Sequence, residues 1–200
     1  MAITFTGSPV TFGFTAASNS TARTIQSAQA IIFGCSMFDD TSDTIAVTIA
    51  GAAPTESFQG GFCYLAVFVG APSGSQTVAV SGGDAGDDWS CGFDGIDGID
   101  EADPFDGAVS DTASPGDIDV VTTADGMAVG MHDASSATTT TDTERWEGPL
   151  TDSVLTHCAS APGTGGTVQL NWSPTDFGCL AVNMRAEAAP VGRRWILGRH

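Results

Sequence analysis

Apolar and polar residues alternate along most of this chain with the period of two that is typical of β-strands. No window of a dozen residues repeats apolar positions at the three- and four-residue spacing of an amphipathic helix. Short strands separated by turn residues predict an all-β fold, an antiparallel β-sandwich in a single domain. The apolar, β-branched or aromatic runs cover residues 3–6, 10–15, 29–38, 43–50, 62–69, 76–81, 88–94, 117–123, 126–132, 152–159, 166–172 and 177–185.

The alternation also assigns side chains to faces, because successive residues of a strand point to opposite sides of the sheet. The intervening positions are mostly small or polar, which predicts that the opposite face of these strands contacts water. Residues 62–69 are apolar on both faces, so we expect a central strand there, or one covered by another subunit. Five sets should each share a buried face: Ile31, Phe33, Cys35 and Met37; Ile45, Val47 and Ile49; Trp89, Cys91 and Phe93; Met127, Val129 and Met131; and Val168, Leu170 and Trp172.

The organisation of the chain is simple at this level. The longest irregular stretches, residues 95–116 and 134–151, are the expected places for functional loops. No internal repeat is evident, and no linker-like break divides the sequence before about residue 187. We therefore expect an N-terminal arm with the first strands over residues 1–27, a sandwich over 28–187 and a basic, apolar tail over 188–200.

The charge balance excludes some classes of partner. The sequence contains 24 Asp and Glu against 6 basic residues, all of them Arg, for a net charge of −18. A surface of that sign repels phosphate backbones and anionic lipids, so we expect neither nucleic acid nor a membrane as partner. The sequence has no run of apolar residues long enough for a membrane helix, and no signal peptide is expected.

Cysteine and histidine give no evidence for chemistry. An odd number of cysteines cannot form a complete internal disulfide framework, so we expect buried, reduced thiols. His132, His157 and His200 lack the spacing of metal ligands, and no nucleophile elbow is present. We therefore expect a protein that is not an enzyme, with no catalytic residue and no cofactor. The five cysteines are Cys35, Cys63, Cys91, Cys158 and Cys179.

An acidic segment, residues 84–106, carries nine carboxylates. Asp94, Asp97 and Asp100 follow one another at three-residue spacing with glycines between them, and hard cations favour such oxygen-rich loops. The EF-hand pattern is not met. Two interpretations stay open, a Ca²⁺ site formed by these three carboxylates and a solvated acidic face.

A second cluster places Arg145 and Trp146 between Glu144 and Glu147. One interpretation is an internal salt bridge, with the indole packed over the stem of the arginine. The alternative is a ligand site, in which a sugar would stack on an exposed Trp146 or Trp89.

The last residues differ in character from the rest of the chain. Half of all the arginines lie in the final eight residues, together with Trp, Ile and Leu. An exposed cluster of this kind promotes aggregation unless it binds a surface. We therefore expect Arg193, Arg194, Trp195, Ile196 and Leu197 to contact an apolar, acidic partner, either a neighbouring copy or another subunit. The alternative is a frayed end.

The order of motifs along the chain resembles a β-sandwich module of tailed-phage structural proteins, which also occurs in some large bacterial surface proteins. The resemblance covers roughly residues 28–186 and depends on the order of the motifs. The residues that carry it are Ala30–Gly34, Val47–Gly51, Tyr64–Gly74, Val78–Gly82, Gly98–Phe105, Thr143–Trp146, Thr167–Trp172 and Leu180–Arg185.

The resemblance implies a jelly-roll-like sandwich on a virion or cell surface, and it does not imply an enzyme. The expected function is that of a capsid decoration or cement protein, anchored on the major capsid protein or other virion subunits and forming a homo-oligomer. The alternative is a tail-tip, fibre or spike module that binds host surface glycans through residues 95–116 and 134–151.

Overall fold

The computed structural model describes residues 2–38, 44–111, 116–136, 139–151, 154–173 and 178–188. Within these ranges the chain forms 17 strands and no helix, and all strand pairings are antiparallel. No helix able to cross a membrane occurs in these ranges. The strands are β1 (Thr4–Phe5), β2 (Val10–Thr15), β3 (Ser18–Ile25), β4 (Ala30–Phe38), β5 (Ala46–Ile49), β6 (Glu56–Gly60), β7 (Cys63–Val69), β8 (Gly74–Ser81), β9 (Asp88–Asp97), β10 (Phe105–Asp111), β11 (Asp117–Val121), β12 (Met127–Ala134), β13 (Thr139–Thr140), β14 (Thr143–Glu147), β15 (Leu155–Pro162), β16 (Thr167–Ser173) and β17 (Gly178–Met184).

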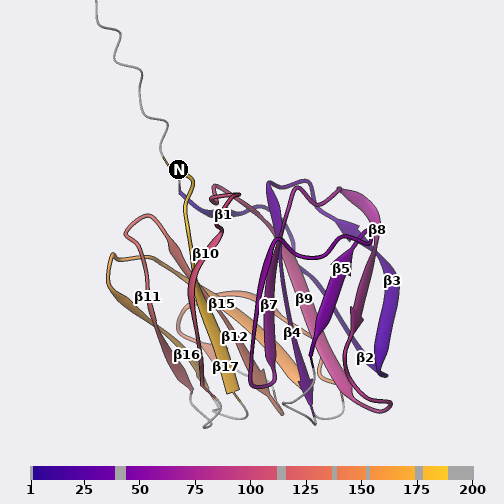
Figure 1. The fold of residues 1–200 in the computed structure, drawn as a ribbon. Helices are drawn as coiled ribbons and strands as arrows, with labels where there is room; N and C mark the ends of the chain where they lie inside the picture. The colour runs from indigo at the N-terminus through magenta and orange to yellow at the C-terminus, as the bar shows by residue number, and fades with distance from the viewer. Residues whose placement is uncertain are drawn as a thin grey trace, which may run out of the picture.

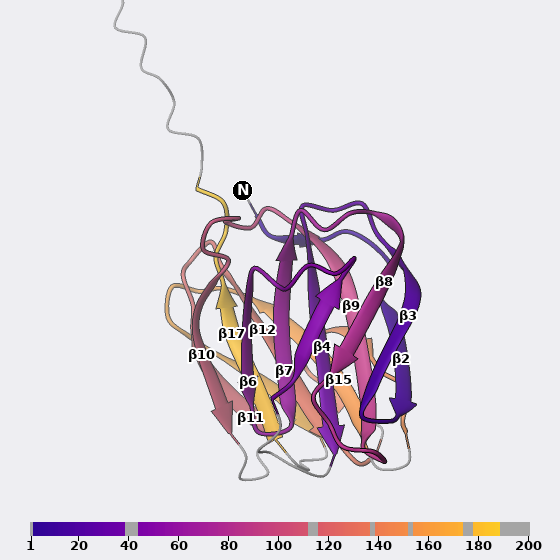
Figure 2. The same ribbon diagram turned by 45° about the vertical axis from the view of Figure 1, so that its right-hand side comes forward.

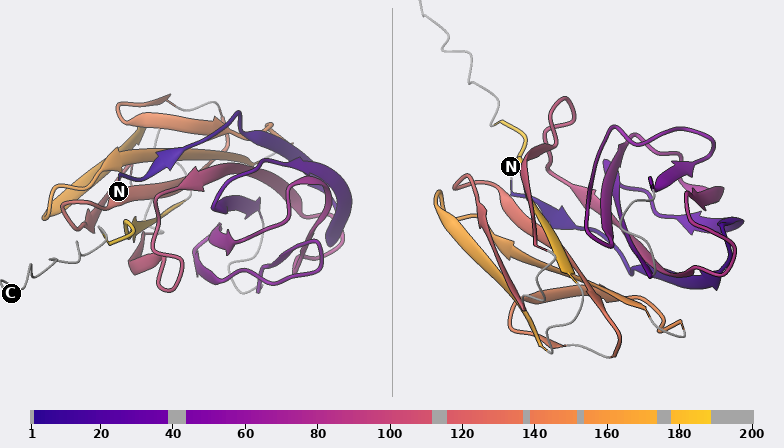
Figure 3. Two further views of the ribbon diagram at one scale, coloured as in Figure 1. Left: turned by 90° about the horizontal axis from the view of Figure 1, so that it is seen from above. Right: turned by 60° about the horizontal axis from the view of Figure 1, so that its bottom comes forward.

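These strands form four sheets that pack face to face, which confirms the antiparallel sandwich (Figure 1). In the N-terminal half, the outer N sheet has the order β3-β8-β5 and the inner N sheet β2-β9-β4-β7-β6, with β1 pairing beside β2 on β9. In the C-terminal half, the inner C sheet has the order β10-β17-β12-β15-β14 and the outer C sheet β11-β16-β13. The two halves lie side by side and meet through their inner sheets (Figure 3).

Both halves have the same strand order. Adding eight to every label of the N-terminal half, from β2 to β9, gives the order of both C-terminal sheets. The sequence alone shows no repeat, so this duplicated order is a feature that only the structure reveals. Each half has the eight strands of a jelly roll, but they divide five and three between the sheets, so the jelly-roll connectivity stays a prediction.

Three hydrophobic clusters fill the spaces between the four sheets. The N core lies between the outer and inner N sheets and contains the large side chains of Phe33, Trp89 and Phe93. The seam joins the two inner sheets, and the C core, with Trp172, lies between the inner and outer C sheets. All five sets of alternating apolar residues share a face as expected, because each set falls within one cluster.

The expectation of a water-exposed second face is wrong for the central strands of the inner sheets and correct for β2 at the edge. Strands β9, β12 and β17 are buried on both faces, as β7 is, because the two inner sheets cover each other. Small residues at the seam allow this close approach. A Cβ atom added at Gly34 would meet the side chain of Met131, and one added at Gly92 would meet the ring of Trp146.

The structure contains five strands that lie outside the apolar runs, namely β3, β6, β10, β13 and β14. Each of them is at the edge of its sheet. Edge strands commonly carry polar and charged residues, so they lack the apolar alternation by which central strands are recognised. The stretches 95–116 and 134–151, expected as loops, contain three of these strands.

Candidate functional site: the terminal end of the stack

The two ends of the described chain lie at the same end of the stack, which we call the terminal end (Figures 1 and 2). The last described residues are held there against the segment that connects the two halves. Ile99 pairs with Ala186 in a β-bridge, and the Glu187 N–H donates to the Gly98 carbonyl at 2.8 Å. The last described residues therefore have a fixed position against the sandwich.

The connecting segment is further held by an ion-pair cluster. One guanidinium nitrogen of Arg185 lies 3.0 Å from a carboxylate oxygen of Asp106, and the other pairs with Asp103. The hydrogen bond to Asp106 raises the pKa of Arg185, and the charges of both carboxylates act in the same direction. This surface cluster orients the exit of the chain more than it stabilises the fold.

A groove of about 600 Å³ opens at the terminal end, which we call the terminal groove. It is lined by residues from the N-terminus, from the turns before β12 and after β15, and from the chain beyond β17. Ile3, Met127 and Pro162 give it an apolar surface, and Asp125 and Glu187 give it negative charge. The groove therefore has the character expected of a surface that receives a basic, apolar segment.

The three carboxylates considered for Ca²⁺ take different partners. Asp94 is buried and accepts a hydrogen bond from the next backbone N–H at 2.7 Å, and burial raises its pKa. Asp97 accepts from the Gln29 N–H at 2.6 Å, and Asp100 accepts from a backbone N–H two residues further on. In the part of the chain that the structure describes, no three His, Cys, Asp or Glu side chains are grouped to hold a metal ion.

Arg145 lies at the edge of the seam, where it joins the two halves. Its Nε donates to Ser160 Oγ at 2.6 Å, and its guanidinium carbon lies 4.0 Å from the ring centroid of Phe5. Burial lowers the pKa of Arg145, and the charge of Asp94 opposes this. Arg145 is half-buried and Trp146 is buried beside it, and the carboxylate whose charge acts on the arginine is Asp94 from β9 rather than one of its sequence neighbours.

The geometry does not bring together the features considered for glycan binding. Trp89 and Trp146 are 0% and 2% exposed, so neither ring is available for stacking on a sugar. Strand β12 begins at Met127, in the terminal groove, and ends at Ala134, eight residues and roughly 25 Å away. The segments that directly follow β9 and β12 therefore lie at opposite ends of the stack. Strand β10 runs from one end to the other, so residues 95–116 reach both ends.

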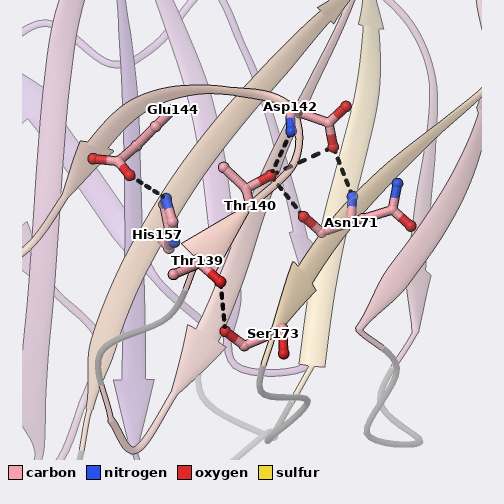
Figure 4. A network of polar contacts seen from close by, with 7 residues as sticks. All are labelled: Thr139, Thr140, Asp142, Glu144, His157, Asn171 and Ser173. Atoms are coloured by element: carbon pink, nitrogen blue, oxygen red, sulfur yellow. Dashed lines mark hydrogen bonds and ion pairs between the residues drawn. The ribbon is translucent and has the colours of Figure 1, made fainter.

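Polar contacts that the sequence does not reveal link β13 to β16 and, beside them, β14 to β15 (Figure 4). Asp142 accepts a hydrogen bond from the Asn171 N–H at 2.8 Å, and Thr140 Oγ1 donates to the Asn171 carbonyl at 2.6 Å. Beside it, His157 is fully buried with its Nε2 3.4 Å from Glu144. Burial lowers the pKa of His157, although the nearby carboxylates oppose this, so the imidazole is neutral at pH 7.

Strand register extends this polar character into the C core. His132 lies directly opposite His157 on one side and Cys179 on the other, and all three are buried. The His132 ring stacks on Trp172 with centroids 5.4 Å apart. Burial raises the pKa of Cys179 to about 12, so this thiol is protonated at neutral pH. No motif in the sequence links these residues, because only the pairing of the strands places them in one row.

Neither the family models, nor the curated proteins, nor the solved structures give a match to the chain. The expected partner-contact residues Arg193, Arg194, Trp195, Ile196 and Leu197 lie outside the described residues. What the structure contributes is the position of the last described residue, Ala188, in the lining of the terminal groove.

Proposed function

We propose that this protein is a non-enzymatic structural protein of a tailed-phage particle, one that decorates or cements the capsid. The observation that carries the proposal is the terminal end. The chain leaves there from a fixed position beside an apolar, acidic groove and continues into a segment with two adjacent arginines, a tryptophan and two aliphatic residues. A rigid body with an adhesive segment at one end suits attachment to a shell.

The fold gives this attachment a physical role. Four packed sheets with three buried clusters form a body that loses little conformational entropy when it binds. A module that binds the assembled shell but not its separate subunits stabilises the shell by mass action. The strongly negative remainder of the surface faces solvent and keeps the particles apart through charge repulsion.

The resemblance to phage modules supports the same proposal. Its motifs lie on strands of all four sheets, including β4 and β7 of the inner N sheet and β17 of the inner C sheet. The likeness therefore extends through the whole stack and is not confined to one half. The alternative of a glycan-binding tail module receives no such support, because the tryptophans considered for sugar stacking are buried.

The copy number in purified particles tests this function. Quantitative mass spectrometry should give a ratio to the major shell protein near one, or a simple fraction of one. A few copies per particle would place the protein in the tail or at a vertex and overturn the capsid assignment. Its absence from particles would overturn the virion proposal as a whole.

Deleting residues 190–200 tests the anchor. The shortened chain should fold, because none of these residues belongs to a described strand, and it should no longer join particles. A finer pair is Leu197→Ala against Leu150→Ala, which removes the same side chain from a 53% exposed position outside the tail. Leu197→Ala should reduce incorporation and Leu150→Ala should not. Normal incorporation of the deleted chain would refute the anchor.

A further inference from the structure

Two of the five cysteines lie directly opposite each other in the inner N sheet. Cys35 of β4 pairs in register with Cys91 of β9, and both are fully buried in the N core. The neighbouring Cys91 thiol raises the pKa of Cys35, in the same direction as burial. Neither residue takes part in the terminal end, so this pair is independent of the proposed function.

The register places the two residues at the right separation for a covalent bond. Residues directly opposite in antiparallel strands have Cα atoms about 4.5 or 5.5 Å apart, and disulfides span Cα separations of about 4.4–6.8 Å. Directly opposite side chains lie on the same face of the sheet, so the two Cβ atoms point into the same core. An aromatic residue flanks the pair on each side, because Cys35 also lies opposite Tyr64 and Cys91 also lies opposite Phe12.

The other three cysteines lack this arrangement in the described strands. Cys63 lies opposite Ser36 and Gly60. Cys158 lies opposite Met131 and Trp146, and Cys179 lies opposite His132 and Asp111, so neither has a second thiol opposite it in these strand pairs.

We propose that Cys35 and Cys91 are an oxidative modification site that closes to a cross-strand disulfide, with a low-molecular-weight disulfide as the oxidant. One cysteine thiolate attacks the small disulfide and releases one small thiol, leaving a mixed disulfide. The second cysteine then attacks the protein sulfur and releases the other small thiol. The protein loses two protons and two electrons, and the small disulfide is reduced to two thiols.

The burial of the pair determines when this reaction takes place. Burial raises the pKa of the Cys35 thiol, so the folded protein holds almost no thiolate at neutral pH, and no oxidant reaches the sulfur atoms. The bond therefore forms while the chain folds, or when β4 and β9 separate transiently. Once closed, it links the two central strands of the inner N sheet and restricts the unfolded chain.

Refolding the full chain with oxidised and reduced glutathione tests this site. Free thiols are then alkylated under denaturing conditions, and the intact mass and the cross-linked peptides are measured. We expect one disulfide, with a loss of about 2 Da for the two hydrogens, joining Cys35 to Cys91. The three other cysteines should be alkylated. The oxidised protein should unfold several degrees higher, and a reductant should abolish the shift.

Two variants serve as matched controls. Cys91→Ala should abolish the mass loss, and Cys158→Ala, an identical change at another fully buried cysteine, should retain it. Five alkylated cysteines after refolding of the wild-type chain, or a disulfide that joins other residues, would overturn the proposal. This wild-type measurement decides the matter even if a variant fails to fold.

Discussion

The two halves of the molecule share a strand order but fill their cores from opposite sides. In the N-terminal half the bulk comes from the inner sheet, where Phe33 and Phe93 lie opposite each other. The counterpart strands of the C-terminal half carry Gly130 opposite Ala181. There the bulk comes from the outer sheet, since a Cβ atom at Gly130 would meet the side chains of Leu170 and Trp172.

A second row differs in polarity. Across β7, β4 and β9 the N core has Tyr64, Cys35 and Cys91 side by side. Across the counterparts β15, β12 and β17 the C core has His157, His132 and Cys179. The comparison teaches that strand order does not depend on particular core side chains. It depends on the alternation of apolar and polar residues, on the positions of the turns, and on whether side chains from one of two facing sheets fill the space between them.

Truncating the large buried side chains of each core should have the largest effect on stability. Phe33→Ala in the N core and Trp172→Ala in the C core should each lower the free energy of unfolding by about 3–5 kcal/mol, because both side chains are buried and leave a cavity. Urea denaturation followed by fluorescence or circular dichroism measures the loss. Val121→Ala, at a 71% exposed position, should change it by less than about 0.5 kcal/mol.

If Phe33→Ala were tolerated as well as Val121→Ala, the assignment of the N-terminal bulk to the inner sheet would be wrong.

Adding a methyl group to the closely packed seam should have an intermediate effect on stability, because the seam joins both halves. Gly92→Ala places a methyl group against the ring of Trp146, and the cost of such overpacking is about 1–3 kcal/mol. Gly166→Ala is the control, because its added Cβ atom meets nothing closer than 3.8 Å. Thermal unfolding of the two variants distinguishes them, and equal melting temperatures would mean that the seam has room to adjust.

The smallest expected effect is a loss of stability of the C-terminal half at acidic pH. Burial lowers the pKa of His157 in the folded state, so the unfolded chain binds the proton more tightly. This contribution to stability is complete above a pH of about 6.5, the unfolded value, and is lost as the pH falls below it toward the lowered folded pKa. The slope for one histidine is at most about 1.4 kcal/mol per pH unit.

Urea midpoints between pH 7.5 and 5 measure this loss. His157→Gln should flatten the dependence, and hydrogen exchange should show that amides of the C core open first. The first 97 residues contain no histidine, so the N core should not respond over the same range. A dependence that is unchanged in His157→Gln would assign the acid sensitivity to other groups.

The sequence is sufficient to predict the central strands but not their layering. Every apolar run contains a strand, because a period of two with β-branched residues has few other solutions. Glycine and serine on the second face of β4 and β9 are compatible with a solvent-exposed face and with a closely packed one. The sequence therefore does not predict the seam. The duplicated order is hidden because counterpart positions differ as much as Phe33 and Gly130 do.

The candidate site was less predictable than the fold. Asp94 and Asp97 are three residues apart in one strand, and an odd spacing sends side chains to opposite faces, so a shared cation is disfavoured once β9 is known to extend to residue 97. The terminal groove is built from four separate segments of small and apolar residues that form no motif. The only signal in the sequence was the composition of the tail, which predicted contact with a partner but no position in the fold.

The closeness of the two ends has one more consequence. Residues 2 and 188 line the same groove, and the halves are connected only once, through the exposed segment around residues 101–103. A short linker joining the ends, with a new opening in that segment, would leave all strand pairings in place. The order of the two halves along the chain is therefore exchangeable, and the position of the new termini would decide which half is synthesised first.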